Sequence, residues 1–310
     1  MADERTESAS DADSDSDSEL KHAPTAVVRR LTTFPVKSLD GCDRDSVRVV
    51  RNGGLDGDRE FALFDSAGEY VNGKRERSIH RVRADFDFET RTLRVSLPDR
   101  ETEAFDVDDD ADGARLTERL SEYFGYEVSL RRNREGGFPD DTEASGPTVI
   151  STATLREVAS WFDGIGVDGM RRRLRANVEL GGLDRELPAF WEDRLFDRRG
   201  RVVDFRIGDV RFAGVNPCQR CVVPSRDPDT GEEYDGLRET FVRRRRETMP
   251  AWSEGVPERR SGGRQTESGG DWFDHNFRLM VNTRVAASSW GETLAVGDEV
   301  RVGDSRPADD

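Results

Sequence analysis

The sequence has little lysine, few cysteines and no long apolar run, and each scarcity excludes a class of protein. Lysine occurs only at Lys21, Lys37 and Lys74, so nearly every cation is an arginine. The 3 cysteines are too few, and odd in number, for a disulfide framework, so any special role falls to individual thiols in a reducing compartment. No stretch approaches the ~20 apolar residues that cross a bilayer, and acids occupy the N-terminus where a signal peptide would be basic and then apolar. We therefore expect a cytoplasmic protein.

Acidic residues are in large excess. The chain has 64 Asp plus Glu against 48 Lys plus Arg, a formal net charge of -16. Such a surface repels phosphates and anionic lipid headgroups, so we expect neither a nucleic acid nor a membrane as partner. Acidic excess with almost no lysine also indicates halophilic adaptation, which points to a haloarchaeal source.

Changes in composition mark a first domain at residues 25–140. Residues 1–24 combine low hydrophobicity with dense like charge, which predicts a disordered, solubilising acidic tail. From Ala26 onward, short apolar runs alternate with Gly, Asp and Asn turn signals, which predicts the strands of a β-barrel or sandwich. These runs are AVVRRLTTFPV, DSVRVV, REFALFD and TLRVSL. Helical periodicity over residues 116–124, followed by the strand-like EVSLRR, closes the domain.

A second domain is predicted at residues 141–303, followed by a short acidic tail at 304–310. Its first run, TVIS, is strand-like, and Thr154 with Glu157 forms the pattern of a capping box that opens a helix. The whole pattern predicts a mixed, β-rich α+β fold with a few helices.

Glycine and arginine mark the loops of this second domain. Gly208-Asp209 predicts a hairpin within residues 201–214, and Gly297-Asp298 predicts another near the end. Residues 243–270 are polar and rich in arginine and glycine, without a defensible period, and are predicted to form a long mobile loop.

The most informative stretch is NPCQRCVVPSRDPDTGE, residues 216–232. It places Cys218 and Cys221 on a turn that the Asn216-Pro217 pair predicts, with Arg220 beside the second thiol. A neighbouring cation favours the thiolate form of a cysteine, which is both the nucleophile and the soft-metal ligand.

Three interpretations of this thiol pair compete when the residues alone are considered. A structural zinc site needs about four protein ligands, but no second CxxC exists and the three histidines are scattered. A thioredoxin-like dithiol normally begins a helix, whereas this segment continues into a turn broken by proline. Both thiols could also be small buried residues without chemistry.

The stretch RCVVPSRDPDTGE resembles the signature of the MOSC superfamily, which includes the mitochondrial amidoxime-reducing component. In that family the second cysteine of such a segment ligates molybdenum, so the resemblance maps the metal ligand and catalytic position to Cys221 and gives Cys218 no metal role. Residues 34–41, FPVKSLDG, and residues 54–65, GLDGDREFALFD, resemble the start of the N-terminal β-barrel domain of the family.

The resemblance extends over residues 26–302 and implies a fold of two parts. These are an N-terminal β-barrel-like domain and a MOSC β-barrel domain with a few helices. It also implies a cofactor of the molybdopterin type, whose phosphate and polar ring edges need cations and donors from several segments. The expected cofactor-binding residues are Lys37, Ser38, Arg59, Ser145, Arg175, Asn177 and Arg220.

Some of these residues have simpler interpretations. Lys37 is notable in a chain that uses arginine almost exclusively, although it could be a surface lysine present by chance. Arg59 could pair with Asp58 or Asp56 within its own turn. Arg173, within the run Met-Arg-Arg-Arg, could belong to a solvated face, and we rank it below Arg175.

The resemblance implies an oxidoreductase that removes oxygen from N-hydroxylated small molecules at the cysteine-ligated molybdenum. The chain lacks the cysteines of an iron–sulfur domain, so electrons are expected from a separate ferredoxin, flavoprotein or cytochrome. It also lacks room for the pyridoxal-phosphate desulfurase domain of the cofactor sulfurases that share the MOSC module. The alternative is a cofactor or sulfur carrier without turnover of its own.

Overall fold

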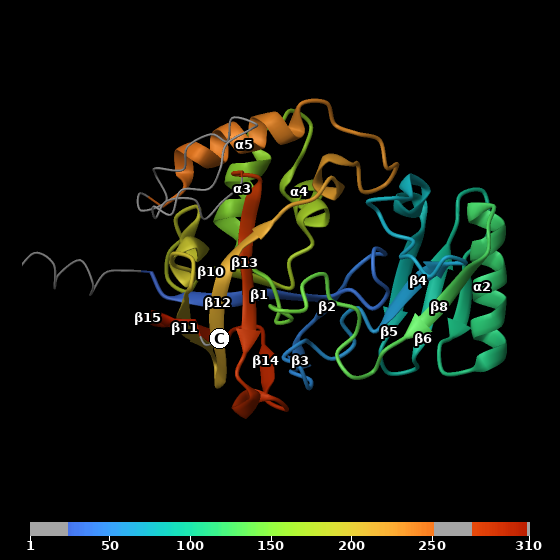
Figure 1. The fold of residues 1–310 in the computed structure, drawn as a ribbon, viewed down its shortest axis with the longest axis horizontal. Helices are drawn as coiled ribbons and strands as arrows, with labels where there is room; N and C mark the ends of the chain where they lie inside the picture. Colours follow the sequence, from blue (N-terminus) through green and yellow to red (C-terminus); the bar gives the residue numbers. More distant parts are fainter. Residues whose placement is uncertain (1–23, 251–274, 309–310) are drawn as a thin grey trace, which may run out of the picture.

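The computed structural model describes residues 24–250 and 275–308. The predicted acidic tail at 1–24, apart from its last residue, and most of the predicted loop at 243–270 therefore lie outside the described residues. Figure 1 shows two units side by side: a barrel with helices over one end, and a smaller unit with a long helix on its outer side.

A closed β-barrel forms the larger unit. Its sheet has eight strands in the order β10-β9-β13-β12-β11-β15-β1-β2, and the additional pairing of β10 with β1 closes the ring and leaves β2 outside it. The predicted β-rich α+β class is therefore confirmed. The strands are β1 (Ala26–Thr33), β2 (Cys42–Arg44), β9 (Val149–Ser151), β10 (Val178–Gly182), β11 (Arg201–Ile207), β12 (Val210–Gln219), β13 (Arg278–Val285) and β15 (Glu299–Pro307).

Alternation along the strands fills the barrel with apolar side chains. Phe205 and Phe212 face each other across β11 and β12 and stack with ring centroids 5.0 Å apart, both almost fully buried. Gly208 has a φ of 56° and allows the tight turn between these two strands, so the predicted hairpin at 201–214 is confirmed.

β1, the first strand along the chain, belongs to this barrel. β1 pairs with β10 and β15, and β3 (Ser46–Arg48) pairs with β14 (Thr293–Ala295). The second predicted hairpin, around Gly297-Asp298, is wrong, because β14 and β15 pair with other strands and not with each other. Residues assigned to the first domain thus complete the barrel of the second, and the division at residue 140 stays a prediction.

The smaller unit has its own apolar core between strands and a helix. Its strands are β4 (Phe61–Asp65), β5 (Arg83–Asp87), β6 (Thr92–Ser96), β7 (Glu103–Asp106) and β8 (Val128–Arg132). β4 pairs with β8, while β5, β6 and β7 form a separate sheet. Helix α2 (Asp110–Phe124) includes the predicted helix but begins earlier, because the Asp109 side chain accepts a hydrogen bond from Asp112 N. α2 buries Leu116 and Leu120 against the sheets.

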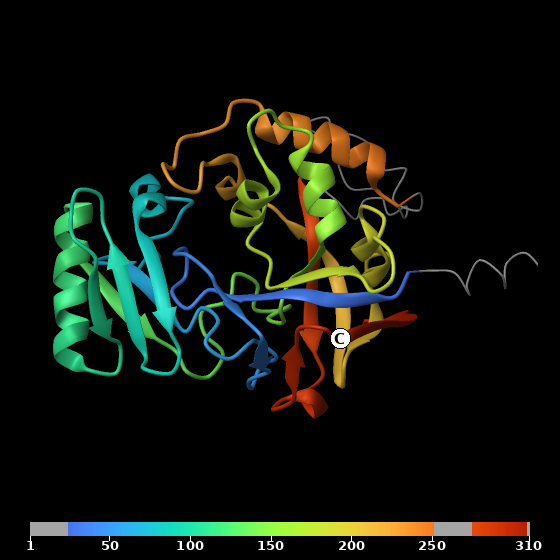
Figure 2. The ribbon, with the colours of Figure 1, turned by 180° about the vertical axis from the view of Figure 1, so that it is seen from behind.

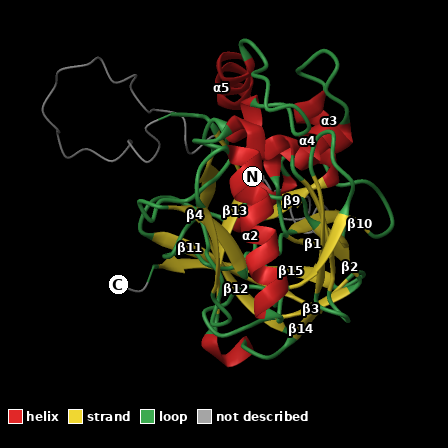
Figure 3. Ribbon diagram, turned by 90° about the vertical axis from the view of Figure 1, so that its right-hand side faces the viewer, coloured by secondary structure: helices red, strands yellow, loops and turns green. Residues whose placement is uncertain are grey.

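Three helices cover one end of the barrel: α3 (Thr152–Ala159), α4 (Val167–Leu174) and α5 (Leu237–Thr248) (Figure 3). The cap of α3 is Ser151, whose side chain accepts from Thr154 N, so the predicted capping box at Thr154 is wrong. The first part of the predicted loop at 243–270 is also wrong, because residues 243–248 belong to α5. Short 3-10 helices are η1 (Arg77–Arg81), η2 (Trp191–Leu195), η3 (Val223–Ser225) and η5 (Ala287–Ser289).

No helix in the described part of the chain combines the length and the apolar character that a bilayer crossing would require.

Candidate functional site

A cavity of about 680 Å³ lies between the two units, at the end of the barrel next to α4. Its wall is contributed by segments that are far apart in the sequence, from the turn after β1 to β13. The structure brings every predicted site residue to this one cavity. These residues are Lys37, Ser38, Arg59, Ser145, Arg175, Asn177, Arg220 and Cys221.

Cys221 lies two residues beyond the end of β12 and is partly buried in the cavity wall. The turn predicted at Asn216-Pro217 is wrong, because both residues belong to β12 and pair with β13. The register shifts on either side of Pro217, and such irregularities are where a strand tolerates proline. β12 therefore carries the chain directly from the barrel to the cavity.

Arg220 contacts the first thiol of the pair. Its Nη1 donates to Cys218 Sγ at 3.1 Å, and its Nη2 donates to Leu174 O at the end of α4, at 3.0 Å. Arg220 Nε is buried without a partner in the described residues. Arg220 thus joins β12 to α4 and engages Cys218, while Cys221 remains available in the cavity wall.

Lys37 is buried, so the interpretation as a surface lysine is wrong. Its Nζ donates to Asp140 Oδ1 at 2.6 Å and to Phe138 O at 2.9 Å. Burial lowers the pKa of Lys37, although Asp140 opposes this effect. Burial alone would raise the pKa of Asp140, but Arg59 and Lys37 hold it well below its usual value. Asp140 is therefore ionised at neutral pH.

Arg59 and Arg175 both adopt left-handed backbone conformations, with φ of 51° and 58°. Arg59 contacts Asp58, as its own turn suggested, and its Nε lies 3.8 Å from Asp140. The guanidinium of Arg175 lies 4.1 Å from the ring centre of Phe34. In the described chain, no carboxylate lies within ion-pair distance of Arg175. Burial, followed by repulsion from Arg59, lowers the pKa of Arg175 to about 10.

Two of the uncharged site residues, Ser145 and Asn177, form side-chain hydrogen bonds within the protein. Ser145 Oγ donates to Asn52 O at 2.5 Å. The side chain of Asn177 joins two strand ends, since its Nδ2 donates to Thr32 O at 3.1 Å and its Oδ1 accepts from Thr148 N at 3.2 Å. Asn177 therefore has a structural role here, and its cofactor contact stays a prediction. Ser38 has a φ of 74° at the cavity wall.

The segment after Cys221 is held by arginines that sequence reasoning undervalued. Arg173 is only 5% exposed, so its interpretation as part of a solvated face is wrong. It donates to Pro224 O at 3.3 Å, to Arg226 O, and to Asp227 Oδ2 at 3.1 Å. Burial lowers the pKa of Arg173, while Asp227 opposes this effect. The three contacts fix the backbone that follows the candidate ligand.

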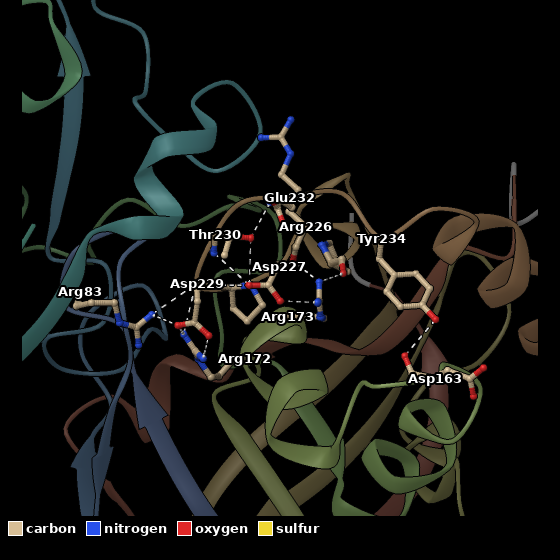
Figure 4. A network of polar contacts seen from close by, with 12 residues as sticks. Arg83, Asp163, Arg172, Arg173, Arg226, Asp227, Asp229, Thr230, Glu232 and Tyr234 are labelled. Atoms are coloured by element: carbon tan, nitrogen blue, oxygen red, sulfur yellow. Dashed lines mark hydrogen bonds and ion pairs between the residues drawn. The ribbon is translucent and has the colours of Figure 1, made fainter. Parts of the chain in front are cut away.

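Asp229 connects the two units across this segment. Figure 4 shows Arg83 and Arg172 approaching Asp229 from two sides. Arg172 of α4 lies 2.7 Å from its carboxylate, and Arg83 of β5 lies 3.0 Å from it. Further along the segment, the Tyr234 hydroxyl donates to Asp163 O at 3.2 Å.

His80 and Arg226 are two further cavity residues that sequence reasoning missed. Arg226 Nη1 donates to Gly73 O, which joins the segment after Cys221 to the smaller unit. His80 Nε2 is buried without a partner in the described residues, and burial lowers the pKa of His80. A Cβ at Gly73 would lie 2.9 Å from His80 Nε2, so this close approach needs glycine. No local pattern marks His80, because it reaches the cavity only through the packing of the two units.

The described residues hold no group of three or more His, Cys, Asp or Glu side chains arranged to bind a metal ion.

Two protein-family models together match residues 25–304 of the chain. The model of the MOSC N-terminal beta barrel domain matches residues 25–164, and the model of the MOSC domain matches residues 148–304. Among solved structures, the YuaD protein from Bacillus subtilis is 13% identical, with 90% of this chain and 95% of that chain covered and a TM-score of 0.34. No curated protein matches the sequence.

Proposed function

Since the chain belongs to the MOSC domain family, we propose that its cavity binds a molybdenum cofactor of the molybdopterin type, with Cys221 as the protein ligand of the metal. MOSC domains are associated with the binding of this cofactor and with sulfurase-like proteins. The observation that carries the proposal is the joint presence, in one cavity, of Cys221 and of the Arg175 guanidinium without a carboxylate partner among the described residues.

The residues present fit an anionic, polar cofactor. A volume of about 680 Å³ lies within the ~300–1,000 Å³ of typical ligand cavities. Eight Lys and Arg side chains and five Asp and Glu side chains line it, an excess of three positive charges in a chain of net charge -16. Four buried nitrogens at its wall lack a partner in the described residues and could donate to a bound group. They are His80 Nε2, Arg173 Nε, Arg220 Nε and Arg226 Nε.

We assign distinct binding roles to the cations. Arg175 can offer its planar donor fork to the phosphate of the cofactor, because no carboxylate in the described chain competes for it. Lys37 and Arg59 share Asp140, which orients both side chains and leaves their remaining N–H groups for polar ring edges. Burial around these groups strengthens each charge-assisted hydrogen bond.

When bound, the cofactor supplies a metal that changes oxidation state and can accept an oxygen atom. The chain itself holds the Cys221 thiol at a fixed place between β12 and η3. Arg173 fixes the backbone after the thiol, and Arg220 holds Cys218 by its sulfur. These contacts orient the Cys221 thiol as a soft ligand and keep the Cys218 thiol in contact with Arg220.

We propose that the protein reduces N-hydroxylated small molecules by removing oxygen, with electrons from a separate ferredoxin, flavoprotein or cytochrome. The support is the resemblance of the segment around Cys221 to the amidoxime-reducing component. The composition supports a cytoplasmic, salt-adapted setting for this reaction.

A second candidate function is cofactor or sulfur hand-over without turnover. Cys221 also lines a second hollow of about 350 Å³. A cysteine that lines two hollows suits transfer to another protein, which favours this alternative.

The test is to dialyse the purified protein exhaustively and measure its molybdenum and pterin content. The same sample is then assayed with a chemical reductant and an N-hydroxylated substrate. Stoichiometric retention with turnover is the expected result. Retention without turnover would favour the carrier, and loss of both metal and pterin would contradict cofactor binding.

A further inference from the structure

The two units of the molecule have separate apolar cores. One cluster of buried apolar side chains belongs to the smaller unit and to the turn after β1, residues 34–41. Two further clusters belong to the barrel and to the helices over its end. Among the described residues, no cluster of buried side chains spans both units. Relative motion is the default expectation for two units whose interface is not a large apolar one.

The segments of chain that connect the two units lie next to one another. They are the turn at residues 34–41, residues 49–60 and residues 133–148. Arg59 N donates to Phe34 O at 2.7 Å, and Phe138 N donates to Arg59 O at 2.8 Å. These hydrogen bonds join the three connections into one strip, about which a smaller unit with its own core can rotate.

A further segment joins the units away from this strip. We call residues 226–233, which follow Cys221 and η3, the bridging segment. Figures 1 and 2 show it, in gold to orange, reaching from the barrel to the smaller unit above the three connections. On the barrel side, Arg172 of α4 lies 2.7 Å from Asp229, and Arg173 donates to Asp227 Oδ2 at 3.1 Å.

Two ion pairs hold the bridging segment to the smaller unit. Arg83 of β5 lies 3.0 Å from Asp229, opposite Arg172 in Figure 4, and Arg77 of η1 lies 3.4 Å from Glu233. The side chains are 41% and 55% exposed in the first pair and 61% and 48% exposed in the second. Pairs this exposed shift an equilibrium by a factor of at most about five each. The contact is therefore specific in its partners but weak.

The bridging segment also forms part of the wall of the large cavity. Arg226 and Pro228 line the cavity together with Gly73 and His80 of the smaller unit and Arg173 of α4. Arg226 Nη1 donates to Gly73 O across the two units. Separation of the bridging segment from the smaller unit would thus open the cavity at this wall.

We propose that the bridging segment is a latch: the smaller unit rotates about the three connections, and the latch holds it closed over the cavity. The closed state is the one described above. Opening breaks polar contacts and leaves both apolar cores intact, so it needs no unfolding. A ligand held by residues of both units exchanges faster when the units separate, so the latch sets the rate of exchange. That this ligand is the pterin cofactor rests on the proposed function.

The first test measures the distance between the units in the cofactor-free full chain. Spin labels replace the exposed side chains of Glu118 in α2 and Arg243 in α5, attached through p-acetylphenylalanine so that the cysteines stay native. Wild type should give one narrow distribution of distances. Arg77→Gln combined with Arg83→Gln, the latch variant, should add a population at longer distance. The loss of two exposed pairs should raise the ratio of open to closed molecules by roughly 5- to 25-fold.

The matched control combines Arg94→Gln with Arg100→Gln. It removes two similarly exposed pairs inside the smaller unit, with Asp85 at 3.4 Å and Glu122 at 2.9 Å, and should keep the distances of wild type.

The second test measures how fast the loaded protein loses pterin and molybdenum on dilution, and how fast stripped protein rebinds them. The latch variant should raise both rates by roughly 5- to 25-fold and leave the equilibrium content nearly unchanged, because neither Arg77 nor Arg83 lines the cavity. Asp229→Asn, which keeps the contact of Arg83 with Asp40 at 3.0 Å, should act in the same direction.

Three outcomes would overturn the latch. The first is an unchanged distance distribution, or unchanged exchange rates, in a latch variant that thermal melting shows to be folded. The second is the same change in the control variant, which would assign the effect to net charge. The third is faster release without faster rebinding, which would make the two arginines contributors to affinity. Absence of any pterin would contradict the proposed function, and the label distances would still decide whether the latch exists.

Discussion

Two arginines of this protein stack on aromatic rings in the interior, and their surroundings differ in one respect. Arg245 of α5 is fully buried 4.7 Å from the ring centre of Phe190, and it donates to both carboxylate oxygens of Asp193 at 2.6 and 2.8 Å. Arg175 lies 4.1 Å from the ring centre of Phe34, and no carboxylate among the described residues pairs with it. The first guanidinium is satisfied by the fold, whereas the second faces a cavity. The comparison separates a cation that holds the protein together from one that is available to a ligand.

The largest effect is expected at the satisfied arginine. Arg245→Ala leaves Asp193 buried without its partner and removes contacts with Arg278 O and Thr248 O, so the free energy of unfolding should fall by about 3–5 kcal/mol. Chemical denaturation measures this. Arg244→Ala, at an exposed neighbour 3.8 Å from Glu247, is the matched control and should cost less than about 1 kcal/mol. Equal losses in both variants would show that the burial of Arg245 does not matter.

Glu192, the neighbour of Asp193, gives the next largest effect. Burial, followed by repulsion from Asp193, raises the pKa of Glu192 to about 7. The folded state therefore prefers the protonated carboxyl, and stability is lost as pH rises from about 4.5 to about 7, by roughly 3 kcal/mol in total. Glu192→Gln should remove this loss and give the more stable protein at pH 8.

Denaturation of wild type and Glu192→Gln at several pH values between 4 and 8 checks this. The exposed Glu186→Gln, which removes a pairing with Arg156 at 2.5 Å, serves as control and should not change the pH dependence. Parallel pH profiles for wild type and Glu192→Gln would contradict the raised pKa.

Arg175→Ala should lower cofactor retention and leave stability nearly unchanged, whereas Arg245→Ala should lower stability. In cofactor-stripped protein we expect its unfolding free energy to change by less than about 1 kcal/mol, since no ion pair with a described carboxylate is broken. Cofactor retention should fall, because a charge-assisted hydrogen bond contributes about 1.5–3 kcal/mol. Denaturation and pterin analysis after dialysis measure the two effects, with Arg94→Ala, paired with the exposed Asp85, as control. Normal pterin content with a large loss of stability would make Arg175 structural.

The smallest effect on stability is expected where exposed charges join the two units. Asp229→Asn weakens the contacts with Arg83 and Arg172, which are partly exposed, and should cost less than about 1 kcal/mol. Asp85→Asn, which removes a similarly exposed pair with Arg94, is its control. A loss of several kcal/mol in chemical denaturation would mean that Asp229 holds the units together.

Sequence patterns predicted those features that depend on residues close together in the chain. The β11–β12 hairpin was predictable because Gly208 lies between two alternating runs, and the motif around Cys221 marked one wall of the cavity. The pairing of β1 with β10 was not predictable, because residues about 150 positions apart meet only in the closed barrel. The residues named from the sequence line one cavity, but the division of this cavity between two units was not predicted.

Arginines were the main source of error. Arg173 and Arg245 both lie in arginine runs, which are typical of solvated surfaces, and only the tertiary structure provides their buried carbonyl and carboxylate partners. His80 gave no signal at all, since its position in the cavity depends on the packing of the smaller unit against the segment after Cys221. A buried charge requires a partner, and the local sequence does not predict where that partner lies.

The most direct measurement of the central claim compares Cys221→Ser with Cys218→Ser in molybdenum content and in turnover with a chemical reductant. A thiolate is a soft ligand, and a serine oxygen is harder and far less acidic, so Cys221→Ser should abolish turnover even where pterin contacts retain some cofactor. Cys218→Ser keeps a polar group of similar size, removes no proposed ligand, and should retain the metal and most of the turnover. Equal loss in both variants would favour a dithiol, and normal turnover in Cys221→Ser would contradict its assignment as the metal ligand.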